Sequence, residues 1–163
     1  MTPKAEGSAS WRRAEKADLT WISAIFDDPA FFGVLGWFGQ EALEDALSSN
    51  ADRLMVWSDG QAPMAFALLS GCDGPVAKVE EFAVVNRGCG VGTASLCALV
   101  DDLAQSGEYE RVWLHVVTDN HRAIGLYRKL GFGHDVFVKD GWRNRHGVLV
   151  DILRLDLVFS DLA

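Results

Sequence analysis

The hydrophobic periodicity of the chain changes near residue 53, and this change limits the available folds more than any other feature. Before it, Leu19, Ile22 and Phe26 lie on one face of a helix that ends near residue 27, and residues 40–50 continue as a second helix. After it, apolar runs alternate with turn residues, as in consecutive strands. The predicted strands are residues 9–15, 53–58, 63–71, 76–85, 111–117, 132–140 and 147–157.

Two further helices are predicted in the second half of the chain. One follows the glycine-rich segment 88–92, carries Leu96, Leu99 and Val100 on one face, and stops at Gly107. The other runs from about residue 120 to residue 130. The element order is then β-α-α-β-β-β-α-β-α-β-β, a mixed α/β (α+β) arrangement whose central three strands form an antiparallel meander. We also expect residues 111–117, which are apolar on both faces, to be covered from both sides.

Composition excludes several classes of protein. The chain has 163 residues, is 49% hydrophobic and contains no internal repeat or linker, so residues 1–163 are expected to form one domain. A net charge of −8 argues against a nucleic-acid partner. No segment reads as a leader or a membrane span, so a cytoplasmic protein without a membrane partner is expected. The spacing of the Cys and His residues predicts neither a disulfide nor a metal site. His115, on the strand that we expect to be covered from both sides, is predicted to be a core imidazole.

The segment Arg87-Gly88-Cys89-Gly90-Val91-Gly92 lies between a predicted strand and a predicted helix. Amide groups at a helix N-terminus bind anions, and glycine lets a phosphate approach the backbone closely. The segment lacks the Gly-Lys-Ser/Thr of a P-loop, and its spacing is not that of a dinucleotide-binding loop. A tight turn without a ligand is the structural alternative.

Two signatures together resemble one family. Residues 87–92 resemble the Arg/Gln-x-x-Gly-x-Gly/Ala signature of the GNAT superfamily of acyl-CoA N-acetyltransferases. Residues 120–132 resemble its second signature, Asn-x-x-Ala-x-x-x-Tyr-x-x-x-Gly-Phe, and the predicted element order is also similar. Two departures are visible: only two residues separate Val84 from Arg87, and Cys89 occupies a position that is often basic in relatives.

The resemblance implies a mostly antiparallel sheet with helices on both faces, in which the fourth and fifth strands splay apart around acetyl-CoA. It implies that loop amides hold the pyrophosphate, and that a backbone N–H near Val84 binds the acetyl carbonyl and stabilises the oxyanion. The cofactor-binding residues implied in this way are Val84, Arg87, Gly88, Cys89, Gly90, Val91, Gly92, Thr93, Asn120 and Tyr127.

The implied reaction is direct transfer of the acetyl group to a primary amine of a small molecule or peptide, with no metal. An alkylamine has a pKa of roughly 10, so it must lose a proton before it attacks. Glu80 and Glu81 are the candidate general bases; regular alternation would turn them to opposite faces, and Glu80 is favoured because it shares parity with Phe82. Tyr127 is the candidate acid for the departing thiolate, as implied by the family. A surface role for the glutamates and a core role for the tyrosine are the structural alternatives.

The acceptor site is the least determined part of the sequence. In the family fold, the segment between the first two helices and the last turn border this site. The first supplies Phe31, Phe32 and Trp37 as candidate substrate-binding residues, which could equally pack in the core or in a homodimer interface. The last turn carries Arg143 and Arg145, which could meet a carboxylate. A non-catalytic acyl-CoA-binding module is the alternative to an enzyme.

Overall fold

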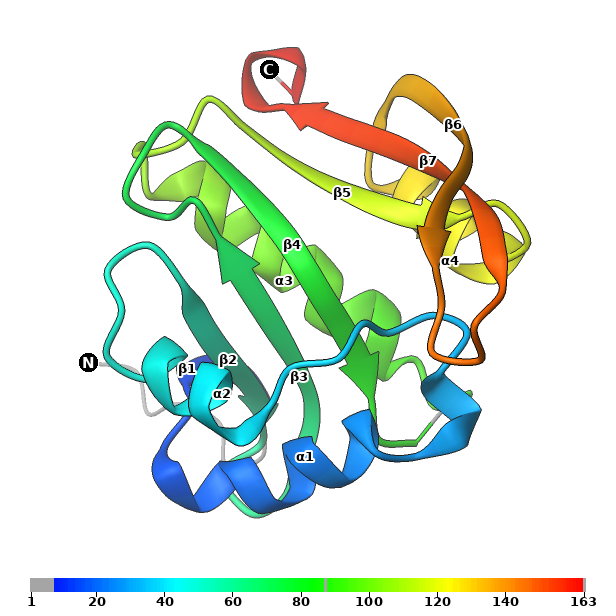
Figure 1. The fold of residues 1–163 in the computed structure, drawn as a ribbon. Helices are drawn as coiled ribbons and strands as arrows, with labels where there is room; N and C mark the ends of the chain where they lie inside the picture. Colours follow the sequence, from blue (N-terminus) through cyan, green and yellow to red (C-terminus); the bar gives the residue numbers. More distant parts are fainter. Residues whose placement is uncertain (1–7, 87, 163) are drawn as a thin grey trace.

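The computed structural model describes residues 8–86 and 88–162, and its centre is a seven-stranded sheet in the order β1-β2-β3-β4-β5-β7-β6 (Figure 1). Every neighbouring pair is antiparallel except β4 and β5, which are parallel. The predicted meander of β2, β3 and β4 is confirmed. The strands are β1 (Ser10–Arg13), β2 (Arg53–Ser58), β3 (Pro63–Ser70), β4 (Val76–Val84), β5 (Arg111–Val117), β6 (Gly133–Arg143) and β7 (Leu149–Val158).

Four α-helices lie on the two faces of this sheet, as expected. Gly107 and Gly131 follow the third and fourth helices with φ of +71° and +102°, the left-handed geometry that ends a helix. Three short 3-10 helices accompany them, at Lys16–Asp18, Pro29–Phe31 and Phe159–Leu162. The α-helices are α1 (Leu19–Phe26), α2 (Gln40–Ala46), α3 (Val91–Gln105) and α4 (His121–Lys129).

Two apolar cores pack against opposite faces of the sheet. One joins α1 and α2 to β2, β3 and the end of β4, and its largest fully buried side chains include Phe26 and Phe66. The other joins α3 to the middle of the sheet through Leu96 and Leu114, with part of α4 against it. Figure 1 shows α1 and α2 in front of the sheet and α3 behind it. The periodicity of the helices therefore predicted their buried faces correctly.

The parallel pair β4–β5 stops short of the strand ends. Its pairing runs from Val76 with Arg111 to Val79 with Leu114, and no pairing follows although β4 continues to Val84 and β5 to Val117. The two strands therefore diverge, as the sequence resemblance implied. Backbone groups of the unpaired ends become available to a ligand that lies between the strands.

Three expectations need correction. Gly141–Arg143 belongs to β6 and pairs with β7, so the last turn is shorter than predicted. Only one face of β5 is covered: Val112 and Leu114 are buried, whereas Trp113 is half-buried. His115, for which a core position was expected, is exposed. The cause is that α1 and α2 cover the first part of the sheet and do not extend over β5 and β7.

The far edge of the sheet carries apolar side chains at its surface. Phe137 on β6 is 57% exposed, and its neighbours Val136 and Val138 are exposed as well. A homodimer through this edge stays a prediction. No helix of the described residues is long and apolar enough to cross a membrane.

Candidate active site

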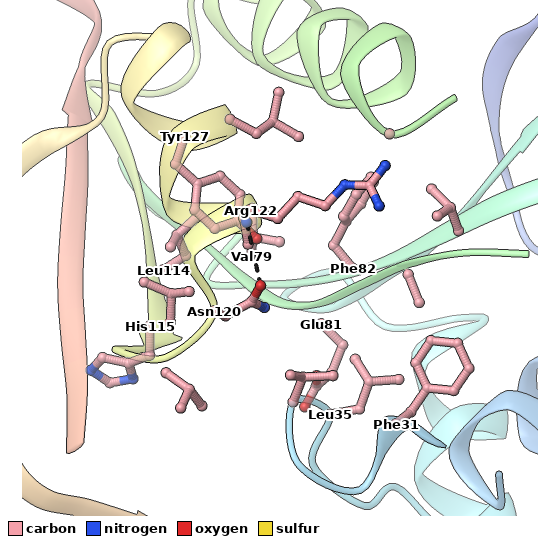
Figure 2. A pocket seen from close by; sticks show the side chains of 18 of the residues that line it. Phe31, Leu35, Val79, Glu81, Phe82, Leu114, His115, Asn120, Arg122 and Tyr127 are labelled. Carbon is pink, nitrogen blue, oxygen red and sulfur yellow. Dashed lines mark hydrogen bonds between the residues drawn. The ribbon is translucent and has the colours of Figure 1, made fainter. Parts of the chain in front are cut away.

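The divergence of β4 and β5 opens a cleft of about 700 Å³, within the range of small-ligand sites. Its walls come from the segment between α1 and α2, from β4 and β5, from the loop before α3, from α4, and from β6 and β7. Figure 2 shows Tyr127 and Arg122 on one side of the cleft and Glu81, Leu35 and Phe31 on the other. Since the strands separate here, the cleft passes from one face of the sheet to the other.

The glycine loop forms one end of this cleft. Gly88 and Gly90 have φ of +87° and +75°, and an added Cβ at either would meet no atom within 4 Å, so the loop faces open space. Gly90 is the N-cap of the 15-residue α3. The first amide groups of a helix have no partner within the helix, and the helix dipole makes this end positive. The loop is therefore built to receive an anion.

Most of the predicted cofactor residues lie together at this end. Val84, Gly88, Gly90, Gly92, Thr93, Asn120 and Tyr127 all line the cleft. Cys89 is exposed and, like Val91, is not among the described residues that line it. Arg87 lies outside the described residues.

The α4 helix contributes a phenol to the cleft. Asn120 caps the helix by accepting the backbone N–H of Ala123 at 3.3 Å, as drawn in Figure 2. This cap orients the first turns of α4, on which Tyr127 points into the cleft. Burial, with a smaller contribution from the negative charge of Glu81, raises the pKa of Tyr127 to about 12. The tyrosine therefore keeps its proton across the physiological pH range.

A β-bulge in β4 determines where the two glutamates point. Leu68 pairs with Glu81 but the next residue, Leu69, pairs with Val79, so Glu80 is an extra residue. Leu68 belongs to the core under α1 and α2, which places Glu81 on that face of the sheet. Glu80 accepts the hydroxyl of Ser70, two residues beyond Leu68, and so lies on the same face. The expectation that the two carboxyl groups face opposite sides was wrong, because the bulge interrupts the alternation.

The two carboxyl groups have different surroundings. Glu80 accepts a hydrogen bond from the Ser70 hydroxyl at 2.7 Å and pairs with Lys78 at 3.0 Å. Glu81 accepts the backbone N–H of Gly36 at 2.8 Å. Burial and the charge of Glu80 raise the pKa of Glu81 to about 8, although the Gly36 N–H and Lys78 oppose this shift. Glu81 is thus a carboxyl group that titrates near neutral pH.

The three aromatic residues predicted to bind substrate occupy different environments. Phe31 lines the cleft. Phe32 lies beneath the guanidinium of Arg145, at 4.0 Å from the ring centroid. Arg145 also donates to the carbonyl of Phe26, which ties the last turn to the segment between α1 and α2. Trp37 is 63% exposed, covers Gly39 and is not among the described residues that line the cleft.

Sequence reasoning missed two residues of the site. Arg122 lines the cleft and extends from α4 toward Phe82 in Figure 2; its place in the second signature could have revealed it. Gly36 contacts Glu81 across 45 positions of sequence, for which no local pattern exists. Among the described residues, no group of three or more His, Cys, Asp or Glu side chains could hold a metal ion.

Residues 10–132 match the model of the acetyltransferase (GNAT) family. No curated protein matches the chain in sequence. Solved structures match its fold, and the three that follow show the fold alone because each is less than 25% identical to this chain.

The spermidine N-acetyltransferase of Vibrio cholerae, solved with CoA and spermine, is 19% identical with a TM-score of 0.79, over 93% of this chain and 96% of that chain. The ribosomal-protein-S18-alanine N-acetyltransferase of Escherichia coli is 21% identical with a TM-score of 0.75, over 93% and 94%. NAA60 of Arabidopsis thaliana, solved with acetyl-CoA, is 15% identical with a TM-score of 0.78, over 94% and 99%.

Proposed function

The chain belongs to the GNAT family of acetyltransferases, and from this premise we propose that it transfers the acetyl group of acetyl-CoA to a primary amine of a small molecule or peptide. The single observation that carries the proposal is the cleft itself. A loop suited to an anion, a tyrosine that keeps its proton and a carboxyl group that titrates near neutral pH all line it. These three groups correspond to three steps of an acetyl transfer to an amine: binding the phosphates of CoA, removing a proton from the amine and protonating the leaving thiolate.

The end of the cleft at α3 fits the diphosphate of CoA. The open positive-φ glycines and the start of α3 supply backbone donors. Arg122 supplies a flexible cation from the opposite wall, and no hydrogen bond or ion pair engages its side chain among the described residues. The position of Cys89 is often basic in relatives, and we therefore assign to Arg122 the positive charge that such a side chain would offer the diphosphate. The unpaired end of β4 would receive the pantetheine arm, which carries the reactive thioester.

We assign the role of general base to Glu81, in place of the Glu80 that sequence parity favoured. Glu80 is neutralised by Lys78 and held by Ser70, so its carboxylate is already engaged. Glu81 faces the cleft with a pKa of about 8, close to working pH, where a base is most effective. An ammonium ion that arrives beside it favours the ionised carboxylate, which can then accept a proton from that ammonium directly or through water.

Tyr127 is the complementary acid. With a pKa of about 12 its phenol stays protonated while Glu81 titrates, so the two groups hold opposite protonation states above pH 8. They come from different elements, α4 and β4, on the two sides of the diverging strands (Figure 2). This separation allows proton removal on one side and proton donation to the leaving thiolate on the other.

Replacement of Tyr127 by phenylalanine tests the enzymatic role. We expect Tyr127→Phe to bind acetyl-CoA normally, as measured by thermal unfolding, and to lose about 100-fold or more in kcat. Tyr109, the other tyrosine of the chain, donates to the carbonyl of Cys72 away from the cleft. Tyr109→Phe is therefore the matched control and should keep full kcat. Binding of acetyl-CoA by the wild type without transfer to any amine would identify the non-catalytic binding module instead.

A further inference from the structure

The acceptor side of the cleft can be separated from the cofactor side by the face of the sheet. Glu80 and Glu81 lie on the face of α1 and α2, whereas α3 and α4 cover the other face. An amine that reaches Glu81 therefore enters from the face opposite to the glycine loop. The residues that line this side decide which amine fits.

The walls of this side are largely apolar. Phe31, Val34 and Leu35 come from the segment between α1 and α2, while Trp142 and Ile152 come from the hairpin of β6 and β7. Leu35 and Ile152 are buried, and Val34 and Trp142 remain accessible. Two segments far apart in the sequence thus contribute hydrocarbon to the lining of this side. Such walls stabilise an apolar body next to the amino group.

Positive charge is not available on this side for an acceptor carboxylate. Among the described lining residues, Lys78 is the cation on this face, and it pairs with Glu80 at 3.0 Å and lies 4.6 Å from the Trp113 ring centroid. Partial desolvation in the cleft and the nearby cations Lys78 and Arg154 lower the pKa of His115, although part of the ring stays exposed, and this favours the neutral imidazole.

The two arginines near this side, Arg143 and Arg145, are not among the described residues that line the cleft. Arg145 stacks on Phe32 and donates to Phe26, and Arg143 donates to the carbonyl of Gly147 at 2.8 Å. A carboxylate bound here would lose its water without gaining a partner, which is costly.

Negative charge is equally limited. Glu80 and Glu81 are the carboxyl groups among the described lining residues, and Lys78 neutralises the first. Asp151, next to Ile152 in β7, is not among the described lining residues, and it accepts the backbone N–H of Asp140 at 2.8 Å. One carboxyl group, Glu81, therefore remains for one ammonium. A second ammonium on the same acceptor would lie against the apolar walls.

From these observations, and resting on the proposed function, we infer that the preferred acceptor is a monoamine whose amino group stands on an apolar body of aromatic size and which carries no carboxylate. The amine nitrogen forms a bond to the acetyl carbon as the bond from that carbon to the sulfur of CoA breaks. Of the two protons that the ammonium loses, one passes through Glu81 to water and the other is balanced by the proton that the leaving sulfur receives, so CoA leaves as the thiol. This acceptor class differs from the polyamine named for the Vibrio cholerae neighbour.

A matched series of amines tests this inference, with CoA release as the readout. We expect kcat/KM for 2-phenylethylamine to exceed that for L-phenylalanine, which differs by one carboxylate, by about 100-fold. L-phenylalaninamide, the neutral analogue, should fall between them, and spermidine should be about tenfold poorer than 2-phenylethylamine. Equal or better use of L-phenylalanine or spermidine overturns the inference while leaving the acetyltransferase intact. No transfer to any amine, with acetyl-CoA binding retained, contradicts the proposed function itself.

A pair of variants tests whether the wall causes the preference. Trp142→Glu adds a carboxylate to the acceptor side and should raise the ratio of spermidine to 2-phenylethylamine kcat/KM by about tenfold. Trp37→Glu is the matched control because Trp37 lies outside the described lining, and it should leave the ratio unchanged. Thermal unfolding with acetyl-CoA verifies that both variants fold. An unchanged ratio in a folded Trp142→Glu protein contradicts the inference.

Discussion

The two ends of the cleft offer different chemical groups: backbone donors at one end and side chains at the other. The cofactor end comes mainly from two short stretches of the chain, the described residues of 86–93 and residues 120–127, and it offers backbone donors and a helix N-terminus. The acceptor end comes from the α1–α2 segment, β4, β5 and the β6–β7 hairpin, and it offers side chains. Backbone donors depend on local geometry, whereas side chains brought together from distant segments depend on the whole fold. The comparison explains why local patterns predicted one end better than the other.

The largest effect should come from the cofactor end. Gly90→Asp places a side chain at φ of +75° and adds a negative charge where the diphosphate is expected. At 100 times its dissociation constant, acetyl-CoA should stabilise the wild type by ~2.7 kcal/mol, or ~5–10 °C in Tm, and we expect this shift to vanish in the variant.

Gly60→Asp is the control for this experiment. Gly60 has φ of +92° in the turn between β2 and β3, so the variant introduces the same residue at a similar backbone conformation away from the cleft. It should keep the full ligand-induced shift. If Gly90→Asp also keeps it, the cofactor end does not depend on the loop.

At the acceptor end, Glu81→Gln should reduce kcat by about 100-fold or more, because the amide cannot accept the proton. Glu80→Gln should keep most of the activity, since Glu80 is engaged by Lys78 and Ser70. The wild-type kcat/KM should rise with pH up to about 8, the pKa of Glu81. A larger loss in Glu80→Gln than in Glu81→Gln would exchange the two assignments.

Glu81→Gln should also be more stable than the wild type at high pH. The folded pKa of Glu81 lies above its ordinary value of 4.5, so the folded state binds the proton more tightly than the unfolded state. This contribution to stability is complete below pH 4.5 and is lost as the pH rises through about 8. Thermal unfolding should therefore show Glu81→Gln gaining in Tm over the wild type between pH 5 and pH 9. A constant difference would contradict the buried carboxyl group.

A smaller effect is expected at Gly36, which positions Glu81. A Cβ at Gly36 would lie 2.6 Å from the carboxyl oxygen of Glu81, so Gly36→Ala must displace this group. We expect about a tenfold loss of kcat, and a higher midpoint in the pH profile because the N–H contact that lowers the Glu81 pKa is weakened. Gly33→Ala, in the same segment with nothing within 4 Å, should change neither. Identical kcat values and pH profiles for Gly36→Ala and Gly33→Ala would contradict a role of Gly36 in positioning Glu81.

The smallest effect concerns the contact between the last turn and the α1–α2 segment. Arg145→Ala removes the stacking on Phe32 and the hydrogen bond to Phe26, together worth ~1–2 kcal/mol. We expect a Tm lower by ~2–8 °C and a two- to threefold higher KM for the amine, with kcat unchanged. Arg143→Ala, whose side-chain bond stays within the turn, is the control. An unchanged KM for the amine in Arg145→Ala would mean that this contact does not influence the acceptor site.

The sequence predicted the order of elements and the buried faces of α1 and α3 because helix and strand periodicities are local. Most of the residues that it proposed for the cofactor line the cleft, because most of them belong to two short segments, 88–93 and 120–127, whose geometry is largely local. It did not predict that both glutamates face one side, because a bulge depends on pairing with β3. It also did not predict that Phe32 and Trp37 lie outside the lining of the cleft, since their positions follow from contacts with Arg145 and Gly39.

The bulge at Glu80 also constrains how this sheet can be re-engineered. Ala77 and Val79 pack under α3, and after one extra residue Phe82 packs there as well, while Ala83 packs under α1. Deleting Glu80 would join Val79 directly to Glu81, restore strict alternation and keep Glu81, Phe82 and Ala83 on the faces they occupy now. Straightening the strand without removing a residue would instead turn Glu81 and every later residue of β4 to the opposite face. A graft of this site onto a regular strand therefore requires one residue fewer.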